Sequence, residues 1–586
     1  MAATSTVRAA ARRTPAHGLR RYLPFLNWLA QYRRADLPSD LVAGIVTAIM
    51  LIPQSMAYAQ LAGLPPQVGL YASVVPLAIY ALLGTSGQLS VGPVAITSLL
   101  VFTAVSPLAA AGSPRYLELA LLLALMVGAL KLVLGVARLG VVLNFISHPV
   151  LAAFTSASAL IIAVGQLKYL LGVSLGGETI FETLALAFTR LPQANAATLT
   201  IGLATVGLLL FFRHGLRPLL RKAGLPALAV TLIVSGAPLI AVIGGILVVW
   251  LARLDLSAGV AIVGAIPAGI ALPQLPAARF ADMEALAPGA LAIVLVSVVE
   301  SIAVARSLAS KRRQVIDPDQ ELIALGAANV TAGFFGGYPV TGGFSRSVVN
   351  AQAGAITGLA SLITAAAIAL ILLFFTPLFT FLPQAVLAAT VLVAVFSLVD
   401  LREPLQIMRT NRGDAATWLI TFVAVLVLGI ENGIFVGVGV SLLLYLWRTS
   451  RPHIAVVGHL EGETYRNILR HKVQTWPEVV AVRIDESLYF ANTRYLEDAL
   501  LRIVAERPEL RHVVLIGSAI NFIDSSALHT LEHLHHELRD SGVELHLSEI
   551  KGPVMDRLSK SDFLRDLGQS RVHRSTHDAM RALGYV

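Results

Sequence analysis

Apolar runs of about 20 residues recur along the chain as far as about residue 450. A helix of that length spans the hydrocarbon core of a bilayer, so these runs predict transmembrane helices. The sequence predicts fourteen spans. Their first and last residues are approximate, most of all between 225 and 250. The predicted spans are 41–63, 66–84, 88–107, 116–136, 141–165, 196–212, 234–252, 284–305, 321–337, 342–352, 356–379, 384–399, 414–429 and 433–447.

The composition excludes several classes of protein. Of 586 residues, 56% are hydrophobic and 13% are charged, whereas soluble domains have about 25% charged residues. A single water-soluble domain is therefore excluded, and so is a disordered or nucleic-acid-binding chain, despite the net charge of +9. The chain has no cysteine, which excludes disulfides and thiolate metal sites. It also has no phosphate-binding loop of the kind that ATP-driven pumps need.

The composition changes near residue 451. From residue 453 onward the chain carries 16 Lys and Arg, 19 Asp and Glu, and 11 of its 14 histidines. In this tail, short β-branched runs at 479–484, 513–516 and 543–547 alternate with helical patterns at 492–506 and 525–541, which predicts a small α/β domain. We therefore expect three parts, listed here: a basic N-terminal arm (1–38), a transmembrane domain (39–452) and a soluble domain (453–586).

The distribution of basic residues predicts the orientation in the membrane. If the N-terminus is cytoplasmic and each predicted span crosses once, 22 Lys and Arg lie on the cytoplasmic side and five lie outside. This asymmetry has the sign that the positive-inside rule requires. An even number of spans then places the N-terminal arm and the C-terminal domain in the cytoplasm. We expect a multi-pass protein of the cell inner (plasma) membrane, for which the absence of cysteine favours a bacterial setting.

Two halves of the membrane domain share a motif. Residues 54–59 (Gln-Ser-Met-Ala-Tyr-Ala) resemble residues 300–305 (Glu-Ser-Ile-Ala-Val-Ala), seven predicted spans later. An offset by an odd number of spans gives the two halves opposite orientations, as in the inverted repeats of transporters. Each motif is followed by a glycine-containing break, at 90–95 and at 341–347. Although six matching residues alone could arise by chance, the matched spacing predicts a seven-plus-seven inverted repeat whose third and tenth spans are broken at mid-membrane.

The two breaks predict an anion site. A helix that begins inside the bilayer presents unpaired N–H groups and the positive end of its dipole, and irregular backbone is tolerated there only where it lines a cavity or is buried in protein. Pro93 suits the first turn of one helix, and Gly343 lets the backbone of the other approach a ligand. Ser345 adds a hydroxyl, and Arg346 adds a full positive charge within the tenth predicted span. The alternative is that the glycines serve helix packing.

A carboxylate lies in the eighth predicted span. Glu300 is flanked by apolar residues, and intramembrane carboxylates commonly have functional roles. We expect Glu300 to couple transport to protons, and the alternative is a static structural pair with Arg346. Gln54 occupies the mirror-related position and can hydrogen-bond a substrate but cannot carry a proton. Tyr58, one helical turn later, could form a wall of the pocket or serve as an interfacial aromatic residue.

The histidines do not predict a metal site. Four of them have helical ligand spacings but no accompanying cysteine or carboxylate pattern, so we expect a solvated helix face: His529, His533, His535 and His536. His148 precedes a proline at a span entry, where a local hydrogen-bonding role is expected. The sequence shows no nucleophile–base constellation, and we expect neither enzymatic activity nor a cofactor.

Several motifs together resemble one family. Residues 53–59, 62–66 and 69–73 resemble the signature of the sulfate permease (SulP) family, solute carrier family 26. Residues 90–95 and 342–350 resemble two later landmarks of that family. In the tail, residues 521–527 (Asn-Phe-Ile-Asp-Ser-Ser-Ala) resemble the STAS domain, which is shared with anti-sigma-factor antagonists.

The resemblance implies a fold, a mechanism and site residues. It implies a fourteen-span, UraA-like fold with core and gate domains, elevator-like alternating access, and a homodimer. The residues that match positions of the family's anion site, or adjoin them in the same motifs, are Gln54, Tyr58, Pro93, Val94, Ala95, Gly343, Phe344, Ser345 and Arg346. Glu300 matches the acidic position of the eighth span, where sodium–bicarbonate symporters of the family have Asp, with Thr one turn later. Val304 stands at that later position here and lacks the hydroxyl, which favours protons over sodium. Ser525 matches the phosphorylated serine of soluble STAS relatives, and helix capping is the alternative.

From these observations we expect a secondary active transporter of a small anion, sulfate or a C4-dicarboxylate, that works by proton-coupled symport. The alternatives are a sodium-coupled bicarbonate symporter, an anion exchanger, a passive anion channel or uncoupled facilitator, and a nucleobase permease of the same architecture. The expected partners are the small inorganic or organic anion, protons, the lipid bilayer and a second copy of the chain. We expect no nucleic acid.

Overall fold

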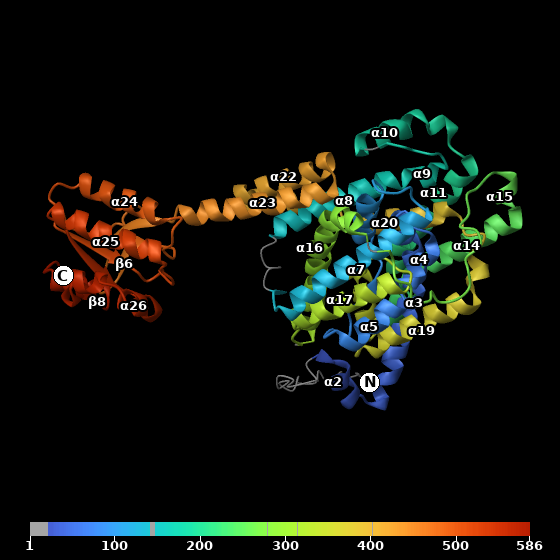
Figure 1. Ribbon diagram of the computed structural model, residues 1–586, viewed down its shortest axis with the longest axis horizontal. Coiled ribbons are helices and arrows are strands. Elements are labelled where there is room, and N and C mark those ends of the chain that lie inside the picture. The colour runs from blue at the N-terminus through green and yellow to red at the C-terminus, as the bar shows by residue number, and fades with distance from the viewer. Residues whose placement is uncertain (1–21, 141–146, 178, 278, 313, 401) are drawn as a thin grey trace. The chain divides into compact units, whose positions relative to one another are not determined.

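The computed structural model describes residues 22–140, 147–177, 179–277, 279–312, 314–400 and 402–586. These residues form two compact units, one that ends at Ser441 and one that begins at Leu442, and each unit is described by itself (Figure 1). Most of the predicted N-terminal arm lies outside the described residues, as do Arg313 and residues 141–146 of the fifth predicted span.

The first unit is helical, as its apolar runs predict. Its helices are α2 (Phe25–Ala30), α3 (Leu37–Leu61), α4 (Pro66–Tyr71), α5 (Val75–Leu83), α6 (Ala95–Val105), α7 (Pro114–Val136), α8 (His148–Gly165), α9 (Leu167–Leu171), α10 (Ile180–Thr189), α11 (Ala196–Leu210), α12 (Arg217–Lys222), α13 (Ala227–Ser235), α14 (Ala237–Ala252), α15 (Leu254–Ser257), α16 (Phe280–Lys311), α17 (Pro318–Phe334), α18 (Phe344–Gln352), α19 (Leu359–Phe374), α20 (Gln384–Phe396), α21 (Glu403–Thr410), α22 (Arg412–Leu428) and α23 (Ile430–Ser450), the last of which contains the point of division. The unit also contains two short strands, β1 (Val91–Gly92) and β2 (Thr341–Gly342).

Eight helical segments of the described chain are long and apolar enough to cross a membrane, which confirms a polytopic membrane protein. They are Arg34–Leu61, Pro66–Leu83, Pro114–Val136, His148–Leu171, Ala196–Lys222, Ala229–Ala252, Phe280–Lys311 and Ile430–Ser450. Shorter apolar helices lie at Ala95–Val105, Ile180–Thr189, Leu359–Phe374 and Gln384–Phe396. The count of fourteen spans stays a prediction.

Several predicted boundaries differ from the structure. The sixth predicted span ends at 212, but α11 continues through a π-helical turn (Phe211–Leu216) into α12, so that basic residues expected in a loop stand at the end of a helix. Long basic side chains reach the water interface from such a position, which lets the helix extend past its apolar run. The apolar helix of the seventh predicted span begins at Ala229 rather than 234. Helix α10 was not predicted, and it is too short to span a bilayer.

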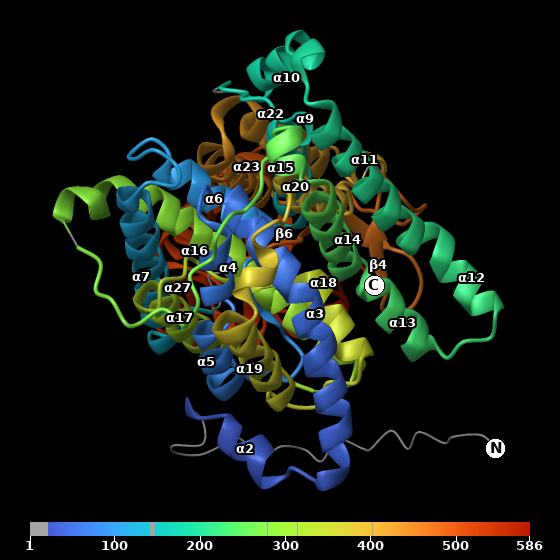
Figure 2. The same cartoon turned by 90° about the vertical axis from the view of Figure 1, so that its right-hand side faces the viewer.

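The two paired strands lie among the first helices of the two predicted repeats. Helix α18 packs against α3, and α6 packs against α16. Figure 2 shows α3 beside α18 and α19 near the front of the first unit. A continuous cluster of buried apolar side chains surrounds these elements and includes Leu51, Met56, Val91, Leu100 and Val298.

The second unit is an α/β domain. It contains β3 (Ile454–His459), β4 (Tyr465–Asn467), β5 (Val479–Ile484), α24 (Thr493–Ala505), β6 (His512–Ile516), α25 (Ser525–Asp540), β7 (Glu544–Ser548), α26 (Gly552–Leu558), α27 (Phe563–Leu567), β8 (Val572–His573) and α28 (Thr576–Ala582). Its sheet has the order β4-β3-β5-β6-β7-β8, in which β5 to β8 are parallel and β3 is antiparallel to both of its neighbours. The three predicted strands and both predicted helices are confirmed within two residues at each end.

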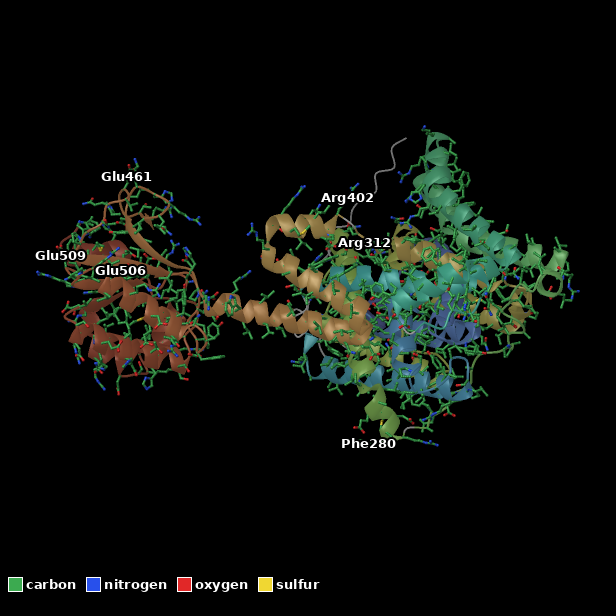
Figure 3. All side chains as sticks on the ribbon, turned by 90° about the horizontal axis from the view of Figure 1, so that it is seen from above. Phe280, Arg312, Arg402, Glu461, Glu506 and Glu509 are labelled. Atoms are coloured by element: carbon green, nitrogen blue, oxygen red, sulfur yellow. The ribbon has the colours of Figure 1, made fainter. Side chains whose placement is uncertain are left out.

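Both faces of this sheet are covered. Alternate residues of the strands pack into two apolar clusters, one that includes Leu515 and Leu534 and another that includes Val514 and Met580. Charged side chains cover the outside of the unit, among them Glu461, Glu506 and Glu509 (Figure 3). This distribution is typical of a domain in contact with water.

The close approach of α4 to α3 gives a first testable prediction. A Cβ atom added to Gly69 would overlap the main-chain carbonyl of Ser55, next to Gln54. We expect Gly69→Ala to destabilise the protein by about 1–3 kcal/mol, because backbone cannot move aside as a flexible side chain can. Thermal unfolding in detergent, followed by tryptophan fluorescence, measures the effect. Gly244→Ala in α14 is the matched control, since nothing lies within 4 Å of its added Cβ; equal melting temperatures for the two variants would contradict the prediction.

Candidate functional site

The two predicted breaks meet in the structure. Strands β1 and β2 pair antiparallel, with Val91 opposite Gly342 and Gly92 opposite Thr341. Helix α6 begins three residues after β1, and α18 begins two residues after β2. Because antiparallel strands run in opposite directions, the two helices leave the paired strands in opposite directions. The predicted interruption of the third and tenth spans is confirmed.

Helices α16 and α17 bind the second break through both side-chain and main-chain groups. The Gly342 N–H donates to the Ser301 hydroxyl at 2.9 Å, and the Thr341 hydroxyl donates to the Ser297 carbonyl at 2.9 Å. Before this strand, Asn329 binds both main-chain groups of Val340, accepting from its N–H at 2.9 Å and donating to its carbonyl at 3.0 Å. The irregular backbone is therefore satisfied within the protein, as membrane depth requires.

Side chains of α18 bind the first break. The Ser90 N–H donates to the Ser347 hydroxyl at 2.9 Å, and the Asn350 amide donates to the Gln88 carbonyl at 3.0 Å. The Gly343 N–H also donates to the Ser90 carbonyl at 3.0 Å. The two breaks consequently form one hydrogen-bonded unit built from both predicted repeats.

Arg346 lies between the two breaks. Its Nη1 donates to the Pro93 carbonyl at 2.6 Å, and the residue is 2% exposed. A Cβ atom on Gly343 would lie 2.9 Å from Nη2, and one on Gly92 would lie 3.4 Å from it, so the glycine at 343 leaves room for the guanidinium. Among the described residues, the buried Nε and Nη2 atoms have no hydrogen-bond partner. A buried donor without a partner costs about 1–3 kcal/mol, and more when it is charged.

Glu300 lies on α16, in the turn that binds β2. Its buried Oε2 atom has no hydrogen-bond partner in the described part of the chain. Among the described groups, the Arg346 guanidinium has one hydrogen-bond partner, the Pro93 carbonyl. It therefore makes no hydrogen bond to Glu300. The charges of Glu300 and Arg346 nevertheless act on each other and on Tyr58, which places the three groups in one region. The alternative for Glu300, a static pair with Arg346, therefore has no hydrogen bond among the described groups.

The other predicted membrane-site residues lie on the same elements. Gln54 and Tyr58 are buried on α3, at 7% and 8% exposure. Residues 93–95, at the start of α6, are buried except for the half-buried Val94. In contrast, Phe344 and Ser345 in the first turn of α18 are exposed, so accessible surface adjoins the buried Arg346.

Ser525 lies in the second unit, apart from these residues in the chain. It is exposed and is the first residue of α25. Asp524 is the capping residue, because its carboxylate accepts from the Ala527 N–H at 2.8 Å. A modification of Ser525 stays a prediction.

The sequence pattern did not predict which residues bind the two breaks. They are Ser297, Ser301, Asn329, Thr341, Ser347 and Asn350, and all are buried. The repeat offered one signal, since Ser55 and Ser301 occupy the same position of the motif. Ser55 donates only to its own helix, at the Ile52 carbonyl, whereas Ser301 reaches β2. The repeat is thus asymmetric at this position.

Histidines of the second unit have partners that the sequence pattern did not predict. His533 on α25 lies near two carboxylates, 3.3 Å from Glu537 and 3.9 Å from Glu497. In the sheet, His546 contacts the side chains of His512 and His573. Burial, and then the positive charge of those two histidines, lowers the pKa of His546 to about 4, so its imidazole is neutral at pH 7.

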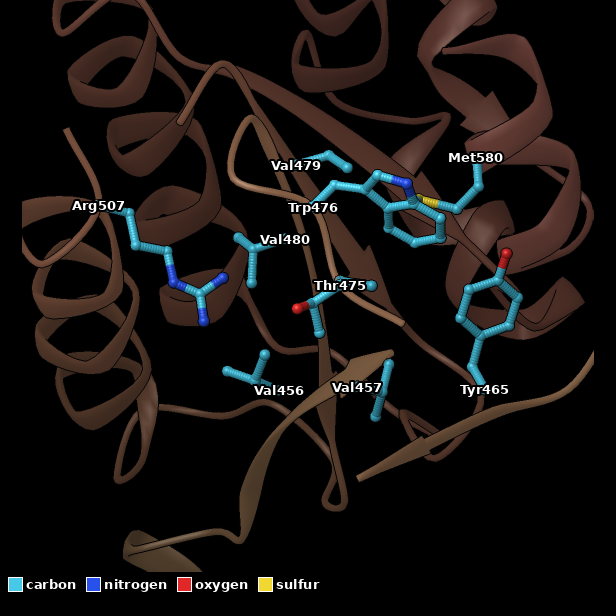
Figure 4. Close-up of a pocket in the computed structure, with 10 residues that line it drawn as sticks. Val456, Val457, Tyr465, Thr475, Trp476, Val479, Val480, Arg507 and Met580 are labelled. Atoms are coloured by element: carbon cyan, nitrogen blue, oxygen red, sulfur yellow. The ribbon is translucent and has the colours of Figure 1, made fainter. Parts of the chain in front are cut away.

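A small cavity in the second unit does not extend the candidate site. It lies between Thr475, Trp476 and Met580 on one side and Arg507 on the other (Figure 4). Its free volume of about 10 Å³ holds one water molecule at most. The two helix breaks of the first unit, where Arg346 has donors without partners among the described residues, are the stronger candidate site.

Comparisons with known proteins agree with the motifs. The Sulfate permease family profile matches residues 37–421, and the STAS domain profile matches residues 471–579. The chain is 37% identical over 578 residues to "Sulfate transporter 4.1, chloroplastic" of Arabidopsis thaliana, covering 96% of this chain and 83% of that protein. It is 32% identical to "High affinity sulfate transporter 1" of Stylosanthes hamata, covering 97% and 86%. Its fold is similar to that of the murine Solute Carrier 26 family member A9 anion transporter, with a TM-score of 0.88, 24% identity and coverage of 98% and 96%.

The role of Asn329 can be tested by its removal. Asn329→Ala leaves the buried N–H and carbonyl of Val340 without partners, and each costs about 1–3 kcal/mol. We expect a lower melting temperature in detergent than for the unchanged protein. Thr331→Ala on the same helix is the control, because the Thr331 hydroxyl bonds only to carbonyls of its own helix. A loss of stability in Thr331→Ala as large as in Asn329→Ala would mean that the contacts to Val340 are unimportant.

Proposed function

The chain belongs to the sulfate permease family, and on that premise we propose that it is a secondary active transporter of small anions, sulfate or a C4-dicarboxylate. The proposed mechanism is proton-coupled symport with elevator-type alternating access. One observation carries the proposal: Arg346 is buried between two interrupted helices and keeps two donors without partners among the described residues. The family consists of transporters, so an enzymatic activity is not proposed.

The substrate proposal rests on the donors that converge at the breaks. The guanidinium offers Nε and Nη2, and the starts of α6 and α18 add unpaired main-chain N–H groups and the positive ends of their dipoles. Oxygens of sulfate or of a carboxylate fit a planar fork of N–H donors. Gln54, Tyr58, Phe344 and Ser345 complete the proposed walls. Names of the relatives favour sulfate among the candidate anions.

The coupling proposal rests on Glu300. A carboxylate with a buried, unpartnered oxygen can take up a proton in one state of the transporter and release it in another. Sodium is less well served, because Val304 lies one turn later, is 5% exposed and offers no oxygen. A residue with a hydroxyl group in place of Val304 would favour a sodium-coupled bicarbonate symporter.

The proposal includes the organisation of the protein. We place a basic arm at 1–38, the transport domain at 39–452 and the STAS domain at 453–586. The excess of Lys and Arg on one predicted side supports a cytoplasmic N-terminus and STAS domain in the cell inner membrane. A homodimer, and regulation by phosphorylation of Ser525, are also part of the proposal. A phosphate on this exposed residue would lie in the first turn of α25, where negative charge is favourable.

One measurement separates the proposed transporter from a channel. Proteoliposomes are given an imposed proton gradient and equal sulfate concentrations on both sides. A symporter accumulates the labelled anion against its electrochemical potential, whereas a channel or uncoupled facilitator cannot. The absence of accumulation for sulfate, bicarbonate, fumarate and succinate would contradict the proposal. Competition by uracil would instead favour a nucleobase permease.

Removal of the Arg346 guanidinium tests the anion site. Each hydrogen bond to a charged group contributes about 1.5–3 kcal/mol, so we expect Arg346→Ala to lower anion affinity by roughly tenfold to a hundredfold per bond lost and to abolish uptake at low substrate concentration. Arg306→Ala is the matched control, since Arg306 is exposed on α16. Near-normal uptake by Arg346→Ala would remove this residue from the mechanism.

Neutralisation of Glu300 tests the coupling. Glu300→Gln keeps the size and hydrogen-bonding capacity of the side chain but cannot exchange a proton. We expect uptake that no longer depends on the proton gradient, while anion exchange between the two sides is partly retained. The control is Glu284→Gln, an exposed carboxylate on the same helix. Uptake by Glu300→Gln that is still driven by the gradient would assign coupling to another group.

A further inference from the structure

Three neighbouring strands of the second unit carry histidines on one face of the sheet. In the register, His512 of β6 is opposite Glu544 of β7, Val514 is opposite His546, and Ser548 is opposite His573 of β8. Successive side chains of a strand point to opposite faces, so the members two residues apart share a face. Strands β6 and β8 are labelled in Figure 1, and β7 lies between them.

Three ligand atoms converge on this face. His546 Nε2 lies 3.3 Å from His512 Nδ1, and Glu544 Oε2 lies 3.5 Å from His512 Nδ1 and 3.7 Å from His546 Nε2. The nearest point at equal distance from all three atoms lies roughly 2.0 Å from each, and points slightly out of their plane reach the bond lengths of roughly 2.0–2.2 Å that Zn²⁺ forms with imidazole nitrogen and carboxylate oxygen. The side chains therefore already have the spacing of a metal site.

The remaining polar atoms of two of these side chains are bound from outside. His546 Nδ1 lies 3.3 Å from His573 Nε2, and Arg571 Nη2 donates to Glu544 Oε1 at 2.6 Å. Metal-binding imidazoles and carboxylates commonly have such outer partners, which fix the tautomer and the orientation of the ligand. In the tautomer of His546 that carries its proton on Nδ1, this contact donates to His573 and leaves the Nε2 lone pair for a metal. His546 is also buried, so its imidazole is held in place by packing.

We propose that His512, Glu544 and His546 bind a divalent transition-metal ion of the zinc class on the STAS domain. Two imidazoles and one carboxylate suit Zn²⁺, and three protein ligands leave a fourth position for water or an external ligand. The sequence pattern did not predict a metal site, because His512 and His546 lie on separate strands and form no local motif. The pairing of β6 with β7 creates the site. This proposal does not depend on the proposed transport activity.

A second cluster offers an internal control. Glu497, His533 and Glu537 could also hold an ion, but His533 is 60% exposed and lies 3.9 Å from Glu497. Its side chains have more freedom than those in the sheet, so we expect weaker binding there. Substitution of His533 therefore tests whether binding measured on the whole protein comes from the helical cluster.

The experiment is a Zn²⁺ titration of the full-length protein in detergent after treatment with a chelator. We expect calorimetry to show one high-affinity site per chain, and Co²⁺ in place of Zn²⁺ to give the visible absorption of a four-coordinate site. Glu544→Gln and His512→Asn should each lower the affinity at least tenfold, while His533→Ala should leave it unchanged. Zn²⁺ should raise the melting temperature of the unchanged protein and of His533→Ala, because a ligand that binds the folded state stabilises it.

Three results would overturn the proposal. They are the absence of stoichiometric binding by the unchanged protein, unchanged affinity in both Glu544→Gln and His512→Asn, and loss of the high-affinity site in His533→Ala. His546→Gln is not the primary test, since that residue is buried and its substitution can unfold the domain. Glu544 is half exposed, and the melting temperature of its variant without metal shows whether the fold is intact.

Discussion

Main-chain polar groups cannot be left unpaired inside a lipid bilayer, and this constraint shapes the membrane unit. A helix that stops at mid-membrane leaves several N–H and C=O groups without partners. Here two interrupted helices satisfy one another through the short β1–β2 pairing. The side chains of Ser301 and Ser347 add bonds to the two breaks. Among the described side chains at the breaks, Arg346 still keeps two donors without partners, and together with the helix starts these are where an anion would bind.

The energetics of this site favour a charged ligand. A guanidinium inside a membrane protein is costly unless it has partners, and Arg346 has the Pro93 carbonyl as its one hydrogen-bond acceptor among the described residues. An anion at Nε and Nη2 would supply the missing acceptors and an opposite charge together. The stabilisation gained on binding then includes relief of the unpaired donors. A neutral ligand would supply acceptors but no charge, which is why the geometry favours an anion over a nucleobase.

The sequence predicted what depends on local patterns, and it missed what depends on pairing between distant segments. Apolar runs and the shared motif around Gln54 and Glu300 predicted the helices and the two breaks, and β-branched runs predicted strands β5 to β7. The contact of Asn329 with Val340 could not be predicted, because a buried amide has no periodicity that shows its partner. The approach of His512 to His546 follows from strand register, which a single sequence does not specify. Helix α12 was missed because its basic residues are typical of loops.

The two predicted repeats contribute different charged residues to the site. One contributes Gln54 and the Pro93 carbonyl, and the other contributes Glu300 and Arg346. A strictly symmetric site would hold two carboxylates or two guanidinium groups, and like charges in a low dielectric repel strongly. The asymmetric site has one carboxyl group and one guanidinium group. Under the proposed coupling, a proton on Glu300 partly offsets the charge of an anion at Arg346, so the loaded site carries less net charge than it would with the anion alone. A smaller net charge lowers the desolvation cost of moving the site between the two sides of the membrane, which gives proton symport a physical basis in this arrangement.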